Sequence, residues 1–187
     1  MEAVRLGEAR PAQLAGDEDT ALALRARAGD RNAFEQLYLR HRNQVYTLCL
    51  NLCGDREQAQ DLLQDTFVRA CRGLRAFRGG SQFGMWLYRI AVNVCREWAR
   101  KRRRQAPPAT VEPPGRDDGD ITSQARAALG QLRESYRTVL ALRYSRSLSY
   151  QEIADLLHWS LPKVKVTIHR AKQAFKEAYL GVGEESG

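Results

Sequence analysis

The sequence predicts an all-α protein of two small helical domains, joined by a proline-rich flexible linker, with the second domain ending in a helix-turn-helix. Apolar residues recur at helical spacing along most of the chain, and no segment alternates as a strand does. The segment 105–120, QAPPATVEPPGRDDGD, carries prolines that stop helices and favour extended backbone. We therefore expect a first domain at 17–104 and a second at 121–181, with loose tails at 1–16 and 182–187.

The composition is that of a soluble globular protein with a polyanionic partner. Hydrophobic residues make up 43% of the chain and charged residues 28%, and the net charge of +8 favours nucleic acid or an anionic membrane surface. No apolar run approaches the roughly 20 residues that cross a bilayer, so we expect no direct membrane insertion. The N-terminus lacks the apolar core of a signal peptide, which makes a cytoplasmic protein the expectation.

The first domain is predicted to begin with a short helix at 20–28 and a long amphipathic helix at 33–52 that Gly54 ends. Asp55 is a candidate N-cap for the next helix, with Gln58 three residues later.

One face of that third helix is acidic, although the chain as a whole is basic. Asp61, Gln64 and Asp65 lie on it, away from the apolar positions. Two interpretations remain open: a solvated surface, or a docking patch for a basic partner.

A loop at 74–83, LRAFRGGSQF, separates this helix from the next. Its Gly79-Gly80 pair lets the backbone approach a ligand closely, and Arg78 adds a cation. Phosphate cradling is an alternative, but the GxxxxGK(S/T) pattern is missing and no strand precedes the loop.

The helix predicted from Ser81 to Arg104 has an apolar stripe and a basic face. The basic face repeats at steps of four, three, four and three residues and is expected to be exposed; its members are Arg89, Asn93, Arg96, Arg100 and Arg103. Arginine neutralises phosphates and asparagine hydrogen-bonds base edges, so the face suits nucleic acid better than plain solvation. Trp86 either belongs to the core or, like Tyr88, offers a stacking surface for an unpaired base.

Four cysteines fall within the predicted helices: Cys49, Cys53, Cys71 and Cys95. Cys49 and Cys53 share a helix face and, with His41, form a candidate metal site or redox pair. Cysteine commonly serves as a small buried hydrophobe, and the chain has neither a CxxC motif nor a second ligand pair. We expect no metal and no cofactor, and leave a redox role open.

The second domain is predicted to contain helices at 122–129 and 131–144, followed by the helix-turn-helix at 148–176. Ser149 and Glu152 form a capping box at the start of the first helix of this motif.

The second helix of the motif turns a basic face outward. Ser160 is its predicted N-cap. Apolar residues at helical spacing face inward, which leaves outside and on the flanks Lys163, Lys165, Val166, Thr167, His169, Arg170 and Lys172. A DNA-reading helix and a solvated basic hairpin are the two interpretations.

Three stretches then form a familiar combination. They are AQDLLQDTFVRA (59–70), FRGGSQFGMWLYRIAVNVCREWARKRRR (77–104) and SYRTVLALRYSRSLSYQEIADLL with KVKVTIHRAKQAF (135–157 and 163–175). Their order and spacing resemble a bacterial RNA polymerase sigma factor of the extracytoplasmic-function group, sigma-70 family, over about residues 19–180. The resemblance implies a transcription initiation factor, not an enzyme, that binds core RNA polymerase and directs it to promoter DNA.

By matching position, the resemblance also implies residue roles. The residues expected to dock on the clamp helices of the polymerase's largest subunit are Asp61, Gln64, Asp65 and Phe67. The loop that captures a flipped base of the −10 element comprises Arg78, Gly79, Gly80, Ser81, Gln82 and Phe83. Recognition and melting of that element involve Trp86, Arg89, Asn93, Arg96 and Arg100. Reading of the −35 major groove involves Ser160, Lys163, Lys165, Val166, Thr167, His169 and Arg170.

Further partners follow from the same resemblance. The second domain should touch the flap tip of the second-largest polymerase subunit, and the linker should thread toward the RNA exit path. An anti-sigma factor, often membrane-bound in relatives, is expected to hold the protein inactive. Three positions depart from the common pattern: Pro162-Lys163 replaces Gly-Thr, His158 replaces Gly, and Gly80 replaces Asp.

Two other classes of function were weighed. A stand-alone helix-turn-helix regulator would leave the acidic patch and the 74–83 loop unexplained. An enzyme would need paired catalytic carboxylates, a nucleophile–base motif or a phosphate loop, and the sequence contains no such motif.

Overall fold

The computed structural model describes residues 12–79, 82–105 and 121–184, and the regular elements within these ranges are all helical. The first domain comprises α1 (Ala12–Arg27), α2 (Arg31–Cys53), α3 (Arg56–Gly73), a 3-10 turn (Leu74–Ala76) and α4 (Phe83–Gln105). The second comprises α5 (Ile121–Gln131), α6 (Glu134–Leu140), a π turn (Ala141–Ser145), α7 (Tyr150–Leu157) and α8 (Leu161–Glu184). The predicted all-α class with two helical domains is confirmed, while the predicted linker at 106–120 lies outside the described residues.

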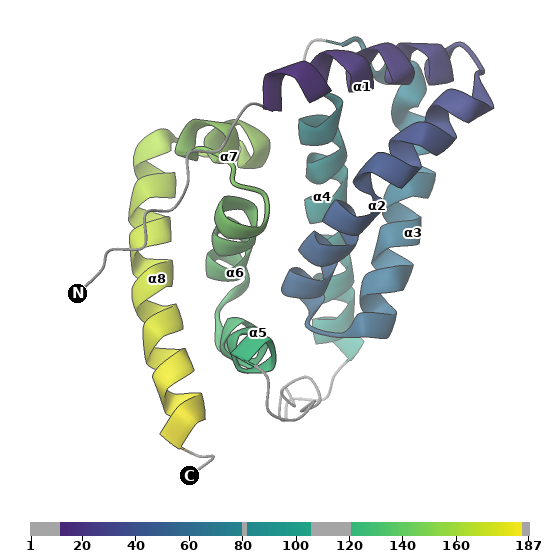
Figure 1. Ribbon diagram of the computed structural model, residues 1–187. Coiled ribbons are helices and arrows are strands. Elements are labelled where there is room, and N and C mark those ends of the chain that lie inside the picture. Colours follow the sequence, from purple (N-terminus) through teal and green to yellow (C-terminus); the bar gives the residue numbers. More distant parts are fainter. Residues whose placement is uncertain (1–11, 80–81, 106–120, 185–187) are drawn as a thin grey trace.

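The first domain is a bundle of α2, α3 and α4, and α1 lies across one end of it (Figure 1). Its core is built from one apolar stripe per helix: Leu37 and Leu48 of α2 and Leu87 of α4 have no exposed surface. Each buried leucine stabilises the fold by about 1.5–3 kcal/mol relative to an exposed one. The stripe therefore fixes which face of α4 is left for other contacts.

Local capping sets the helix boundaries in this domain. Asp55 accepts a hydrogen bond from the backbone amide of Gln58 at 2.8 Å, as predicted, and Gly54 ends α2 with a left-handed φ of 81°. Two boundaries differ from prediction. The first helix begins at Ala12 instead of residue 20, and α4 begins at Phe83 instead of Ser81.

In the second domain, α7 and α8 form the predicted helix-turn-helix. The Ser149–Glu152 capping box is present, with the serine hydroxyl 3.2 Å from the Glu152 amide and the Glu152 carboxylate 2.7 Å from the Ser149 amide. His158 ends α7 in the left-handed region (φ 54°, ψ 44°), the conformation expected where relatives carry glycine. Small buried residues, Ala154 and Ala171, lie where α7 and α8 pack together.

Two predictions about this domain were inaccurate. The single helix expected at 131–144 begins only at Glu134 as α6 and continues as the π turn, which ends before Ser147 at a φ of 52°. The last helix, α8, continues to Glu184, past the expected domain end at 181.

The two domains pack against each other along α2 and α4. The C-terminal half of α2 contacts α5, α6 and the π turn, and α4 contacts α7. One cluster of buried apolar residues runs through both domains. Asn51 of α2 donates a hydrogen bond to Ser145 of the π turn at 2.7 Å. The face of α4 that points away from its own core therefore lies against the second domain (Figure 1).

Loss of the capping box should destabilise the helix-turn-helix. Ser149→Ala removes the acceptor for the Glu152 amide and should lower the free energy of unfolding by about 1 kcal/mol, whereas Ser149→Thr keeps an acceptor and should lower it less. Urea titration followed by circular dichroism measures both. Equal losses for the two variants would contradict a capping role.

Candidate nucleic-acid interface

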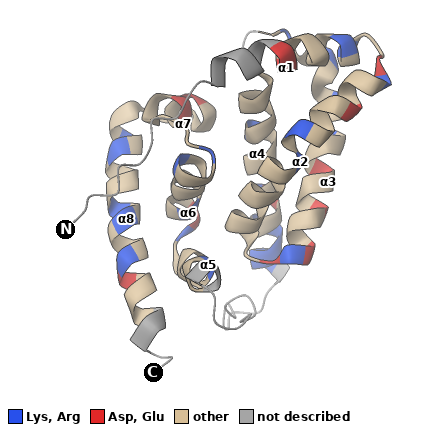
Figure 2. Ribbon diagram, in the orientation of Figure 1, with Lys and Arg blue, Asp and Glu red and all other residues tan. Residues whose placement is uncertain are grey.

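The second helix of the helix-turn-helix, α8, presents a basic face to solvent. Val164 and Ile168 are 0% and 1% exposed and point into the core of the second domain. The residues predicted to face outward do so: Lys163, Lys165, Val166, His169 and Arg170 are exposed, and Thr167 is half-buried. Figure 2 shows the basic residues recurring along this helix. An unpaired basic helix face of this kind suits the phosphates and base edges of a DNA groove.

The first turn of α8 is held in a defined orientation. Ser160 accepts a hydrogen bond from the backbone amide of Lys163 at 3.4 Å, which agrees with its predicted capping role. The ammonium group of Lys163 lies 4.2 Å from the centre of the Trp159 ring, a cation–π contact. Pro162 is exposed beside them. The Pro162-Lys163 departure from the common pattern therefore lies on an ordered surface at the start of α8.

The basic face of α4 is not uniformly exposed, which corrects the expectation from sequence. Asn93 and Arg100 are exposed, but Arg89 and Arg96 are half-buried against the second domain. Arg89 donates to the carbonyl oxygen of Asp155 at 3.4 Å. Arg96 and Arg103 both form ion pairs with Glu134, at 3.7 Å and 2.7 Å. The helical period places all five on one side, but that side meets a neighbouring domain.

Among the described residues of the predicted base-capturing loop, Arg78 and Gln82 are exposed. Gly79 has a φ of 73°, in the left-handed region where a side chain is strained. The Arg27 guanidinium donates to the carbonyl oxygen of Phe77 at 2.9 Å and fixes the start of the loop. Gly80 and Ser81 lie outside the described residues.

Aromatic rings hold both ends of this loop. Phe83 has no exposed surface, and its ring packs against those of Phe77 and Trp86 at 5.8 Å and 5.5 Å. Tyr88 is 6% exposed and donates to Gln44 at 2.6 Å. Phe83 therefore supports the loop from the core, and Tyr88 offers no free stacking surface in this arrangement. Trp86 is half-buried, so that part of it remains accessible.

The predicted acidic patch on α3 is smaller than its residue list suggests. Asp61 and Gln64 are exposed. Asp65 pairs with Arg69 at 3.0 Å, and Arg69 also reaches Glu97 at 2.6 Å. Phe67, predicted to contact a partner, is only 5% exposed. Its ring lies 4.8 Å from that of Tyr38, so it anchors α3 to α2 instead.

Sequence reasoning missed one exposed apolar residue beside this patch. Val68 is 46% exposed and follows Asp61, Gln64 and Asp65 at the spacing that places residues on one helix face. A valine outside the apolar stripe of an amphipathic helix was the available signal. The patch is therefore partly apolar, which is typical of a docking surface.

His41 and the cysteines form no shared site. His41 Nε2 lies 2.6 Å from a carboxylate oxygen of buried Asp19, and this pair joins α1 to α2. Burial raises the pKa of the Cys53 thiol to about 11, which makes it a poor nucleophile at neutral pH. No group of three His, Cys, Asp or Glu side chains within the described ranges is placed to hold a metal.

None of the helices in the described part of the chain has both the length and the apolarity to cross a membrane.

Two family models match the chain, one for each domain. "Sigma-70 region 2" matches residues 37–105, and "Sigma-70, region 4" matches residues 122–175. The RNA polymerase sigma-H factor of Pseudomonas aeruginosa is 34% identical over 184 residues, covering 88% of this chain and 95% of that protein. The ECF RNA polymerase sigma-E factor of Haemophilus influenzae is 29% identical over 174 residues, covering 83% and 92%.

The fold is also similar to a solved structure of CnrH in complex with the cytosolic domain of CnrY. The TM-score is 0.66 at 27% identity, and the match covers 86% of this chain and 96% of that one. The similarity extends over both domains, so the arrangement of helices described above is shared and not a feature of one half of the chain.

The buried Asp19–His41 pair should make the free energy of unfolding depend on pH in the acid range. Burial disfavours the charged form of Asp19, but hydrogen bonds and charge from His41 and then Arg40 outweigh it and lower its pKa. A lowered pKa in the folded state adds stability above about pH 4, which is lost as the pH falls through the folded value. Asp19→Asn should cost about 1–3 kcal/mol at pH 7 and give a shallower decline below pH 4.

Urea titrations at pH 7 and pH 3 measure this difference. Glu18→Gln is the matched control, because Glu18 pairs with the same Arg40 but is 70% exposed. If the free energy of unfolding of Asp19→Asn fell with pH as steeply as that of the wild type, the Asp19 carboxylate would not be the group responsible.

Proposed function

Because this chain belongs to the extracytoplasmic-function group of the sigma-70 family of RNA polymerase sigma factors, we propose that its two basic faces bind two promoter elements. It is a transcription initiation factor, without catalysis of its own, that directs core RNA polymerase to promoters. In this proposal α8 reads the −35 duplex, and α4 with its preceding loop binds the −10 element. The exposed basic face of α8 above its buried Val164–Ile168 seam is the observation that carries the assignment.

The chemistry of α8 supports base reading at its N-terminal half. Val166 is 49% exposed and offers an apolar contact for a thymine methyl group. Arg170 lies one turn further on and can bind guanine through two hydrogen bonds. Lys163 and Lys165 supply phosphate contacts near the positive end of the helix dipole. The ordered Trp159–Lys163 contact at this end is where we expect the −35 preference to depart from that of relatives.

The proposal that α4 and its preceding loop bind the −10 element is supported by exposed polar groups on this loop and along the helix. Arg78 and Gln82 are exposed on either side of residues 80 and 81, Gly79 has a left-handed backbone, and the rings of Phe77 and Phe83 are buried. Asn93 and Arg100 continue the surface along α4. These groups suit an unpaired base and its flanking phosphates.

The patch formed by Asp61, Gln64 and Val68 on α3 is the proposed docking site for core polymerase. Its partner would be the clamp helices of the largest subunit, while the second domain contacts the flap tip. A mixed apolar and acidic patch on a basic chain requires a partner surface that is basic with an apolar centre.

Regulation by an anti-sigma factor is proposed from the similarity to CnrH, which has been solved in complex with the cytosolic domain of CnrY. Such a partner would hold this protein in the cytoplasm, at the membrane surface when the partner is membrane-bound.

Arg170→Ala should weaken −35-dependent transcription in a sequence-selective way. Loss of a base contact costs about 1–3 kcal/mol at one base position and leaves the others unaffected. Run-off transcription with core enzyme on a promoter library measures the change. Lys165→Ala is the matched comparison, because loss of a phosphate contact should weaken all promoters alike. A uniform loss in Arg170→Ala would contradict base reading, and wild-type protein that cannot initiate with core enzyme would contradict the function itself.

Asp61→Arg with Asp65→Arg should reduce the affinity for core polymerase by at least about tenfold, because like charges at an interface repel. Co-purification and fluorescence titration with core enzyme measure it. Glu177→Arg, an exposed reversal on α8, is the charge control. Unchanged core binding by the double variant would place the docking site elsewhere.

A further inference from the structure

A groove of about 1130 Å³ lies where α4 meets the end of α5, the start of α6 and the turn before α8. Its volume is slightly above the roughly 300–1,000 Å³ of typical small-molecule sites. Five charged side chains line it: Arg96, Arg103, Arg133, Glu134 and Arg137. The groove is therefore large enough for a nucleotide, and its lining decides which charge such a ligand must carry.

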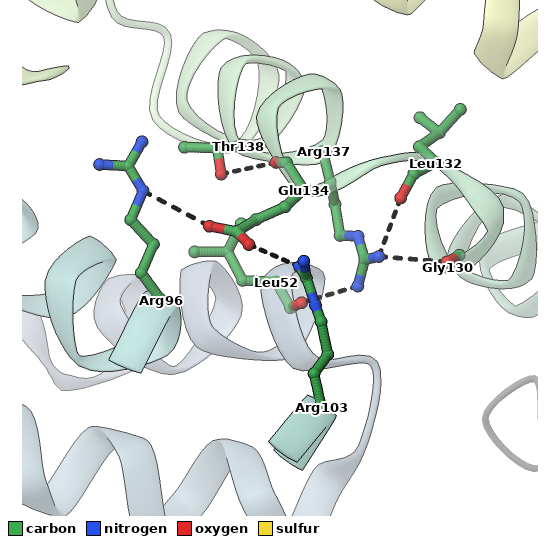
Figure 3. A network of polar contacts seen from close by, with 8 residues as sticks. All are labelled: Leu52, Arg96, Arg103, Gly130, Leu132, Glu134, Arg137 and Thr138. Carbon is green, nitrogen blue, oxygen red and sulfur yellow. Dashed lines mark hydrogen bonds and ion pairs between the residues drawn. The ribbon is translucent and has the colours of Figure 1, made fainter. Parts of the chain in front are cut away.

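The lining of the groove carries more positive than negative charge. It contains four guanidinium groups and one carboxylate, that of Glu134. Figure 3 shows this carboxylate between Arg96 and Arg103, with which it pairs at 3.7 Å and 2.7 Å. Among the described residues, no carboxylate forms an ion pair with Arg133 or Arg137. An excess of positive charge of this kind attracts an anion with several charges.

Arg137 is a half-buried cation that is held by carbonyl oxygens and by no counter-ion. Its guanidinium donates to the carbonyl oxygens of Leu52, Gly130 and Leu132 at 2.8, 3.1 and 2.9 Å (Figure 3). Its Nε is buried and has no hydrogen-bond partner within the described part of the chain. Burial lowers the pKa of Arg137, and the nearby charge of Glu134 offsets this only in part. An anion in the groove would stabilise this guanidinium, because it would supply the negative charge that the site lacks.

An aromatic ring at one side of the groove adds a stacking surface. Trp159 lines the groove and is half-buried, so part of its ring is accessible. The ammonium group of Lys163 lies 4.2 Å from the centre of this ring and restricts its orientation. A partly exposed tryptophan beside arginines suits a flat heterocycle joined to an anionic group, since the heterocycle stacks on the indole and the anion pairs with the guanidinium groups.

We propose that this groove binds a purine nucleoside polyphosphate, with its phosphates at Arg103, Arg133 and Arg137 and its base against Trp159. An inorganic polyphosphate would leave the tryptophan unused, and a nucleoside without phosphates would leave the arginine charges uncompensated. A purine is favoured over a pyrimidine because its two fused rings cover more of the indole. The site does not depend on the proposed promoter contacts, and it is tested on the free chain, without core enzyme or promoter DNA.

Isothermal titration calorimetry with GTP, in magnesium-free buffer, should show that one GTP binds per chain. GTP should bind at least about threefold more tightly than tripolyphosphate, which lacks the base, and tripolyphosphate should bind more tightly than guanosine, which lacks the charge. The affinity should fall as the salt concentration rises, since the phosphate contacts are electrostatic. Absence of GTP binding, or GTP binding no tighter than that of tripolyphosphate, would overturn the proposal.

Arg133→Gln removes one charge from the groove at an exposed side chain that makes no capping hydrogen bond. It should weaken GTP binding at least about fivefold, with the circular dichroism spectrum unchanged. Arg42→Gln is the matched control, because Arg42 is exposed on α2 and does not line the groove. Equal GTP affinities of Arg133→Gln, Arg42→Gln and wild type would refute the site.

The indole N–H resonances of the wild-type protein locate the base without a stability change. GTP should shift the Trp159 signal more than tripolyphosphate does. The Trp98 signal should stay in place, because the Trp98 Nε1 donates to Gln58 at 2.8 Å, outside the groove. The spectrum of Trp159→Phe identifies the Trp159 signal. A Trp159 signal that GTP leaves in place would exclude stacking on this ring and contradict the proposal.

Discussion

Closely spaced guanidinium groups on α4 are the constraint on which the rest of the architecture depends. Like charges repeated along one helix line repel one another unless an anion or a carbonyl dipole lies close by. The opposite face of α4 is committed to the first-domain core through Leu87, Ala91 and Val94. The second domain packs where both conditions are met: the Glu134 carboxylate pairs with Arg96 and Arg103, and the buried apolar cluster continues from the first domain into the second. The position of α5–α7 against α2 and α4 therefore follows from the need to compensate the arginine charges and to bury the shared apolar cluster.

Features set by neighbours in the chain were predictable. The Ser149–Glu152 box and the Asp55 cap join residues three apart, and the inward direction of Val164 and Ile168 follows from the helical period alone. Phe83 lies on the apolar stripe of its helix, so its burial follows from the same period, but the partners of Phe83 and the burial of Tyr88 were not predictable in this way. Their partners lie on α2, on the loop before α4 and, for Tyr88, at Arg146, whose guanidinium lies 4.8 Å from its ring centre. Periodicity cannot identify a partner so distant in sequence.

The two predicted DNA-binding faces differ in the same way in how far the sequence predicts them. The exposure of the basic face of α8 is predicted correctly because it depends only on the periodicity of that one helix. The face of α4 has an equally clear period, but a period does not say whether arginines meet water, DNA or another domain. Glu134 gave no signal in the sequence, since an acidic residue in the first turn of a helix is common wherever it stabilises the helix dipole. Only the packing of α6 against α2 in the folded chain brings this glutamate to Arg96 and Arg103 of α4.

The two proposed DNA faces therefore differ in availability within one packed molecule. The α8 face is exposed, and Figure 1 places α8 on the far side of α6 from α4. The first turn of α8 nevertheless lies near the contact between the domains, because Lys163 packs on Trp159, which lines the groove beside Arg96 and Arg103. On α4, Arg96 and Arg103 are paired with Glu134 of the second domain. Domain packing therefore leaves most of the proposed −35 face in solvent, whereas the proposed −10 face contributes Arg96 and Arg103 to the contact between the domains.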